Sequence, residues 1–199
     1  MIDATPTRSV VLEMKEERRA MHDGYVFLDE KCLLLAGEIL RELARYEALR
    51  HVFLTSWTSA VAALQGAVAR HGLHGLAVYP ARKWAARVSR ASRGLMGVRL
   101  LDAALEGDAG PAPPAVDASP EADTCRAAFA AVLAAAAPLA ASTGNLERLA
   151  LEYRRSVRRA RALQDVLLPE LDRDVAELEA RSEELEQEEA IFMRQGLVA

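Results

Sequence analysis

Residues 21–39 read MHDGYVFLDEKCLLLAGEI, and the spacing of their apolar side chains decides the fold. These side chains recur in steps that alternate between four and three residues: Met21, Tyr25, Leu28, Cys32, Leu35 and Ile39. This heptad spacing is typical of a helix that buries one narrow stripe against another helix. It predicts an N-terminal coiled-coil segment over residues 1–71, whose helix begins near residue 10 and is capped by Gly72.

The C-terminal part of the chain carries a second heptad pattern. Ser119 suits a helix N-cap, Pro120 suits the first helical position and Glu121 suits the positive end of the helix dipole. The stripe then includes Leu163, Leu167, Leu171 and Leu178. We therefore expect a C-terminal coiled-coil helix over residues 119–199.

Irregularities are predicted inside this second helix. Steps of four residues from Leu163 to Val175 favour a nearly straight stretch. Pro138 and Pro169 each remove a backbone donor and crowd the carbonyl four residues back, so kinks are expected near Ala134 and Asp165.

Neither long helix can bury its stripe alone, and an antiparallel hairpin is the simplest solution. The segment between them, residues 72–118, has alternating apolar positions around Met96 and a turn-rich end. The predicted fold is mainly α, a long antiparallel two-helix coiled-coil hairpin with a small inserted central segment that could contain one β-hairpin.

Charge is distributed in blocks along the last helix. Arginines dominate residues 148–161, and acids dominate residues 170–189. Like charges on neighbouring turns repel, so such blocks favour contacts with other chains. The candidates for these contacts are Arg154, Arg155, Arg158, Arg159, Arg161, Glu183 and Glu184.

The bulk properties exclude several classes of protein. A net charge of −4 argues against nucleic-acid binding, and we assign the local arginine stripe at residues 82–99 to an acidic partner. Two cysteines are too few for a disulfide scaffold or a cysteine-based zinc site. We found no uninterrupted apolar stretch of about 18 residues, so no membrane insertion is expected. No Ser/His/Asp set is evident, and no cofactor or metal is predicted.

Three stretches resemble the D subunit of V/A-type ATPases and ATP synthases. The N-terminal segment has Pro6-Thr7-Arg8 followed by Gly24, Leu28, Lys31, Leu35 and Glu38 at that family's spacing. Residues 157–171, VRRARALQDVLLPEL, are similar to the family's run of the type T-R-R-V-N-A-L-E-x-V-x-I-P-x-L. Residues 94–100, GLMGVRL, are similar to its short central signature. The matches occur in the family's order.

The resemblance implies a non-catalytic central-stalk rotor subunit in the cytoplasm, peripheral to the membrane. The paired helices would form an axle inside a hexamer of A and B subunits, and the charged candidates above would contact that hexamer. The central segment would meet the F subunit and the socket subunit on the membrane ring. Its candidate contact residues are Trp84, Met96, Val98 and Arg99.

Three other interpretations have distinct signatures. A generic coiled-coil scaffold would usually form a parallel dimer. An enzyme would need its site in residues 72–118, which carry no catalytic constellation. A membrane-surface helix is disfavoured because anionic lipid would repel the acid-rich C-terminal face.

Overall fold

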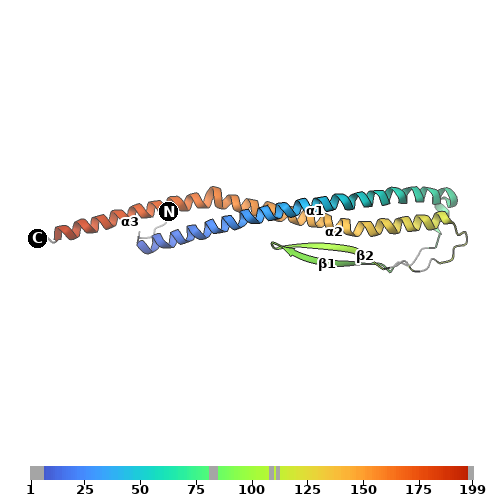
Figure 1. Cartoon of the computed structure of the whole chain (residues 1–199), viewed down its shortest axis with the longest axis horizontal. Helices are drawn as coiled ribbons and strands as arrows, with labels where there is room; N and C mark the ends of the chain where they lie inside the picture. The colour runs from blue at the N-terminus through green and yellow to red at the C-terminus, as the bar shows by residue number, and fades with distance from the viewer. Residues whose placement is uncertain (1–6, 81–84, 108–109, 111–112, 197–199) are drawn as a thin grey trace. The chain divides into compact units, whose positions relative to one another are not determined.

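The computed structural model describes residues 7–80, 85–107, 110 and 113–196, and most of these residues are helical (Figure 1). In chain order they are α1 (Arg8–Ala77), β1 (Arg87–Leu95), β2 (Val98–Glu106), α2 (Pro120–Ala162), a π-helix η1 (Leu163–Leu167) and α3 (Leu168–Gly196). The predicted fold class is confirmed, because the two-stranded antiparallel sheet lies in sequence between the long helical segments.

The chain forms two compact units, and each combines an N-terminal with a C-terminal stretch of sequence. Unit 1 contains residues 1–34 and 153–199, and unit 2 contains residues 35–152. This grouping follows contacts in space. The division of the sequence at residues 71 and 118 stays a prediction.

In unit 1 the first turns of α1 pack antiparallel against α3. Ion pairs join Arg8 to Glu186, Lys15 to Glu179 and Arg18 to Asp172. As the residue number rises along α1, the residue number of the paired acid in α3 falls. The two helices therefore run antiparallel. Between these pairs lies a small apolar core of Val11, Met14, Val175 and Leu178, with Val10 and Leu171 packed against it.

The apolar seam of unit 1 takes one step of five residues at η1. The Leu168 N–H donates to the Leu163 carbonyl, five residues back, and the seam passes from Leu163 to Leu168. Leu167 is therefore 39% exposed, which corrects its predicted place on the seam. The predicted stretch of four-residue steps is replaced by this single longer step, after which Leu171, Val175 and Leu178 resume the heptad.

The two prolines of the second helix behave differently. Pro169 follows directly after η1, so the helix is perturbed at Asp165 as predicted. A π-turn fits there because proline cannot donate to a carbonyl four residues back. At Pro138 the helix α2 continues without a break, and the perturbation predicted near Ala134 leaves no interruption in it.

In unit 2 the rest of α1 packs antiparallel against α2. The Trp57 ring meets Phe129 edge-on at a centroid distance of 6.4 Å. Nearer the carboxyl end of α1, His71 Nε2 lies 2.6 Å from Ser119 Oγ. Buried alanines, Ala60 and Ala67, allow the helices to approach closely.

The predicted helix start at Ser119 is observed, whereas α1 does not end at Gly72 as predicted. Ser119 Oγ accepts the Ala122 N–H at 3.2 Å, so Ser119 is the N-cap of α2 as predicted. Gly72 has a left-handed φ of 66° and breaks the helical geometry as predicted, but helical turns resume and α1 ends at Ala77.

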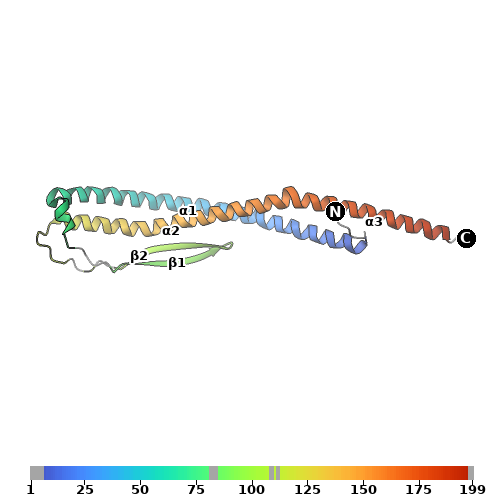
Figure 2. The same cartoon turned by 180° about the vertical axis from the view of Figure 1, so that it is seen from behind.

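Strands β1 and β2 form the predicted hairpin around a two-residue turn. Met96 and Gly97 both have positive φ, 46° and 85°, which is the conformation of a type I′ turn. Leu95 pairs with Val98 next to the turn, and the register continues to Arg87 opposite Glu106. Figures 1 and 2 show β2 on the α2 side of β1.

The expectation that no segment is apolar enough to span a membrane is too strict. Two helical stretches, Arg8–Ala77 and Pro120–Arg194, contain 18-residue windows with mean hydropathy 1.3 and 1.6, enough by length and composition alone. The second stretch includes residues 127–146, which carry no charge, but half of them are alanine. Such windows also occur in helices of proteins that do not cross membranes.

Candidate functional site

Five arginines of unit 1 form a surface that we call the arginine patch: Arg154, Arg155, Arg158, Arg159 and Arg161. All five are exposed. None has an ion pair with another residue that the structure describes. Since like charges at neighbouring helical turns repel, the patch costs the isolated helix a few tenths of a kcal/mol per pair, roughly 0.2–0.5. An acidic partner surface would remove that repulsion and would be attracted over long range.

The acid block is partly neutralised within the chain. Asp172, Glu179 and Glu186 pair with basic residues of α1, so these acids are not free for other chains as the charge pattern suggested. The two acids predicted to contact other chains, Glu183 and Glu184, are exposed and have no ion pair among the described residues.

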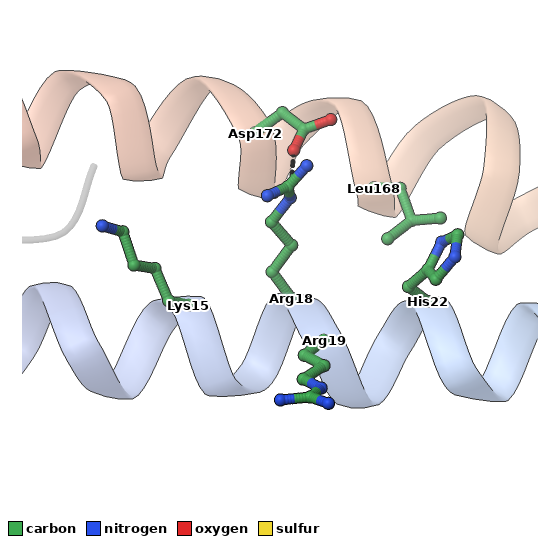
Figure 3. Close-up of a pocket in the computed structure, with 6 residues that line it drawn as sticks. All are labelled: Lys15, Arg18, Arg19, His22, Leu168 and Asp172. Carbon is green, nitrogen blue, oxygen red and sulfur yellow. Dashed lines mark ion pairs between the residues drawn. The ribbon is translucent and has the colours of Figure 1, made fainter.

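A groove of unit 1 lies beside these ion pairs (Figure 3). It has a volume of about 460 Å³ and is lined by Lys15, Arg18, Arg19, His22, Leu168 and Asp172. Arg18 reaches across it to Asp172 in Figure 3. An anionic ligand would have to compete with that carboxylate, so the groove is a poor cofactor site.

Most of the predicted seam residues are buried or half-buried. Leu35 and Leu178 are buried. Partly buried seam residues are Met21, Tyr25, Leu28, Cys32, Ile39, Leu163 and Leu171. Burial raises the pKa of the Cys32 thiol, assisted by Asp29, so the thiol is protonated at neutral pH and is a packing group.

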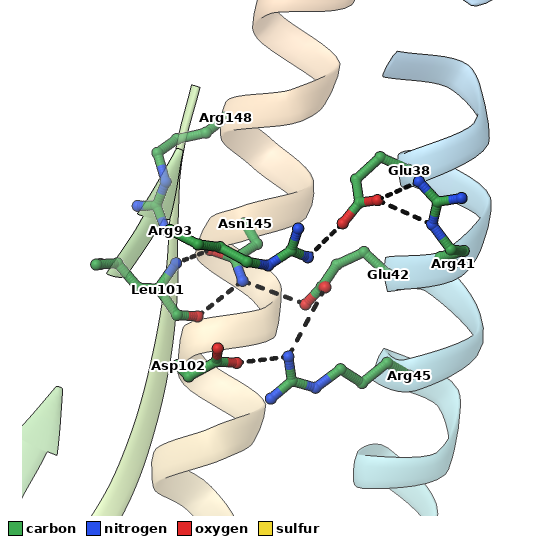
Figure 4. A network of polar contacts seen from close by, with 9 residues as sticks. All are labelled: Glu38, Arg41, Glu42, Arg45, Arg93, Leu101, Asp102, Asn145 and Arg148. Carbon is green, nitrogen blue, oxygen red and sulfur yellow. Dashed lines mark hydrogen bonds and ion pairs between the residues drawn. The ribbon is translucent and has the colours of Figure 1, made fainter. Parts of the chain in front are cut away.

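Unit 2 holds its β-hairpin against the helices through Asn145, which is 1% exposed (Figure 4). Asn145 Oδ1 accepts the Leu101 N–H at 2.8 Å, and Nδ2 donates to the Leu101 carbonyl at 2.8 Å. The same amide donates to Glu42 at 3.3 Å, and Arg148 donates to Asn145 Oδ1 at 2.8 Å. One side chain thus links β2, α1 and α2.

A buried carboxylate, Glu38, makes the second link of this network. It accepts from Arg93 of β1 and from Arg41, whose Nε lies 2.9 Å away. Burial alone would raise the pKa of Glu38, but the hydrogen bonds from Arg93 and Arg41 outweigh it and hold the pKa below its usual range. A third link joins Arg45 to Asp102 of β2 at 2.5 Å.

The predicted central contact residues divide into three groups. Met96 and Arg99 are exposed at and beside the turn. Val98 is 6% exposed and packs inside unit 2, so its side chain is not available to a partner, which corrects that expectation. Trp84 lies outside the described residues.

His71, Ser119 and Asp117 come together although no Ser/His/Asp set was evident from sequence. His71 Nδ1 lies 3.4 Å from Asp117, and Nε2 lies next to Ser119 Oγ. Ser119 is 4% exposed and its Oγ already accepts the Ala122 amide. The serine therefore caps a helix and is closed to a substrate, so the cluster fastens α1 to α2.

Metal ligands are not grouped in the described residues, where no set of three or more His, Cys, Asp or Glu side chains could hold an ion. Burial raises the pKa of the Cys125 thiol, which keeps it protonated at neutral pH.

Large apolar side chains are exposed on both units. In unit 1, Phe27 is 57% and Phe192 is 79% exposed, and in unit 2 Leu40 and Trp57 are exposed as well. Exposed apolar groups in such number are typical of chains that are covered by partners.

Sequence reasoning missed the polar network of unit 2. Its signal was present, because Glu38 and Glu42 fall on the same helix face as Leu35, where a coiled coil expects apolar groups. A charged side chain at such a position usually has a buried partner. Which partner it has depends on the hairpin register and is not visible in the sequence.

Comparisons with known proteins agree with this architecture. The model of a protein family described as the D subunit of ATP synthase matches residues 10–195. A curated protein of Thermotoga neapolitana, the D subunit of a V-type ATP synthase, is 24% identical over 198 residues, which cover 97% of this chain and 96% of that protein. The matched region includes the arginine patch, the hairpin and all but the outermost residues of the long helices.

Proposed function

Because this chain belongs to the family of ATP synthase D subunits, we propose that it is the non-catalytic central-stalk rotor subunit of a V/A-type rotary ATPase. In this role it couples ion-driven rotation of the membrane ring to ATP synthesis or hydrolysis in the hexamer of A and B subunits. The complex is cytoplasmic and peripheral to the membrane at this subunit.

The observation that carries the proposal is the chemistry of unit 1. Two antiparallel helices enclose a small apolar cluster of four buried side chains, and the arginine patch faces outward without acidic partners among the described residues. A slender helix pair with one charged side presents a different surface in each direction. That asymmetry is what a rotor needs.

Rotation would then be coupled to catalysis because each catalytic interface contacts a different side of unit 1. A catalytic interface that meets the arginine patch experiences a potential that the other interfaces do not. For rotation to change nucleotide affinity, each orientation must stabilise a different interface state by real free energy, typically about 1–3 kcal/mol for coupled sites. Glu183 and Glu184 add charge of the opposite sign on the same unit.

Unit 2 provides the surfaces for the remaining partners. Met96, Arg99 and the exposed Trp57 side chain are the groups that we assign to contacts with the F subunit or with the socket subunit of the ring.

Co-purification tests the class of complex. The tagged chain, isolated from detergent-solubilised native membranes, should bring down A, B and F subunits in fixed stoichiometry. Recovery of the chain as a dimer of itself without these subunits would favour a generic coiled-coil scaffold.

Charge reversal tests the arginine patch. Arg158→Glu with Arg159→Glu should lower ion pumping per ATP hydrolysed several-fold, since the lost contacts are part of a coupling energy of about 1–3 kcal/mol. Arg181→Glu is the matched control, because Arg181 is exposed on the same unit but pairs locally with Glu177. Unchanged coupling in the double variant, with helicity and assembly retained, would refute the role of the patch.

A further inference from the structure

We propose that the outer edge of β1 is a docking site for an extended acidic segment of another protein chain, which adds to the hairpin as a third strand. The inference rests on the proposed function only in taking the partner from the same complex. It is carried by the register of the hairpin, by the way the opposite edge is closed and by the charge of the exposed face.

The register determines which backbone groups point outward. In a two-residue hairpin the pair beside the turn, here Leu95 and Val98, exchanges both hydrogen bonds, and every second pair does the same. The residues between them direct N–H and C=O away from the partner strand. On β1 these are Val88, Arg90, Ser92 and Gly94.

The backbone bonds of Leu101 on β2 agree with this assignment of outward-pointing groups. Leu101 pairs with Ser92, a position that does not exchange ladder bonds, and its N–H and carbonyl do point outward, where both bind Asn145. The Asn145 amide therefore acts as a short piece of neighbouring strand. The outer edge of β2 is occupied at its centre, and it faces the helices (Figure 4).

Within the described part of the chain, nothing covers the outer edge of β1 in this way. No hydrogen bond joins the outward backbone groups of Val88, Arg90, Ser92 or Gly94 to any residue that the structure describes. The strand is nine residues long and contains no proline. An unpaired edge of this length is a template for strand addition, in which backbone bonds supply affinity and alternate side chains supply specificity.

The charges on the exposed face of the hairpin indicate which kind of segment would bind at this edge. The hairpin face that carries Arg93, Val98 and Leu100 points toward the helices, because Arg93 binds Glu38 and the other two are buried. The opposite face contains two arginines, Arg90 and Arg99, and no acid: Val88, Arg90, Ser92, Gly94, Arg99, Leu101, Ala103 and Leu105. Val88 is 53% exposed on that face. The complementary strand alternates acidic with apolar side chains.

The arginines also disfavour wrong partners. A second copy of β1 paired antiparallel about Arg90 would set Arg90 against Arg90 and Arg87 against Arg93, and like charges across a strand pair are destabilising. Self-pairing of the edge is thereby suppressed while an acidic segment is still accepted.

Hydrogen exchange on the free chain and on the assembled complex tests the proposal. In the free chain the amides of Val88, Arg90, Ser92 and Gly94 should exchange fast, whereas the ladder amide of Ala91 is protected. In the complex the four outward amides should slow by at least about tenfold. Unchanged exchange in a complex that does assemble would overturn the third strand and leave the proposed function intact.

Proline substitutions separate strand addition from simple burial. Ser92→Pro removes an outward N–H and leaves the hairpin ladder whole, so the free chain keeps its fold while protection at Val88, Arg90 and Gly94 in the complex is lost. Ser92→Ala is the matched control and should retain that protection. Ala91→Pro removes a donor of the hairpin ladder, so it shows the exchange pattern of a hairpin that has lost its own pairing.

The outcomes are distinct. Protection that persists at Val88, Arg90 and Gly94 in Ser92→Pro would overturn strand addition. A wild-type chain that joins no complex of A and B subunits would overturn the proposed function, and this inference with it.

Discussion

Unit 1 closes its helix pair with a short apolar seam flanked by exposed ion pairs, whereas unit 2 closes its pair around buried polar side chains. In unit 1, Arg8, Lys15 and Arg18 reach acids of α3 at the surface, where ion pairs contribute little. In unit 2, Asn145 and Glu38 are buried and satisfied by the β-hairpin. Removing one member of a buried network leaves its partners unpaired, so the two units should respond very differently to single substitutions.

The largest effect is expected in the apolar core of unit 2. Leu149→Ala removes a side chain that is 0% exposed and should destabilise the unit by about 2–5 kcal/mol. Urea unfolding followed by tryptophan fluorescence measures it, because Trp57 belongs to unit 2. Leu151→Ala is the control, since Leu151 is 49% exposed. Equal losses in the two variants would contradict the packing described.

The second largest loss of stability is expected for Asn145→Ala. It deletes both bonds to Leu101 and leaves that residue's N–H and carbonyl without their partner, at a cost of about 2–3 kcal/mol. The Leu101 amide should become the site of fastest new hydrogen exchange. Thr143→Ala, an exposed neighbour on α2 whose hydroxyl binds only the Leu139 carbonyl, should cost less than about 0.5 kcal/mol. A small effect at Asn145 would mean that the hairpin is held by its apolar residues alone.

Glu38 should make unit 2 sensitive to acid. Because its pKa is lowered in the folded state, its contribution is fully present above the unfolded pKa of glutamate, about 4.3, and is lost as pH falls through the lower folded pKa. Glu38→Gln should cost about 1–3 kcal/mol at pH 7 and flatten the dependence of unfolding free energy on pH between 5 and 3. Glu47→Gln, at an exposed glutamate of α1, is the matched control and should cost less than about 0.5 kcal/mol at pH 7. An unchanged slope in Glu38→Gln would show that Glu38 is not the titrating group.

The smallest effect belongs to the surface pairs of unit 1. Lys15→Ala or Arg18→Ala should lower stability by less than about 1 kcal/mol, and 1 M salt should abolish the difference because both side chains are exposed. Hydrogen exchange of α3 amides provides the measurement. A loss above about 2 kcal/mol would erase the contrast between the units.

The helical architecture was predictable because heptad spacing and caps are local signals. The seam from Met21 to Ile39 and the cap at Ser119 needed only neighbours in sequence. In the structure Leu35 is buried, the other residues of this seam are half-buried, and Ser119 caps α2. The hairpin was predictable in outline from the alternation around Met96.

What could not be predicted depends on contacts between distant residues. The partnership of Asn145 with Leu101 requires the hairpin register and the rotation of α2 together. Val98 was expected at a partner surface because strand alternation does not say which face is covered. The ion pairs of Lys15 and Arg18 with acids of α3 likewise could not be predicted without knowing how α1 pairs with α3.

The π-helix η1 has a consequence for changes in chain length. A π-turn accommodates one surplus residue while the helix on either side keeps its face, so the heptad before Leu163 and the heptad after Leu168 remain aligned. Deleting one exposed residue of this turn, such as Val166, would restore a regular four-residue step without rotating Val175 or Leu178 out of the core. The same deletion one turn earlier or later would rotate everything beyond it by about 100° and expose that core. Unit 1 should therefore tolerate a change of length at this turn and nowhere else along its seam.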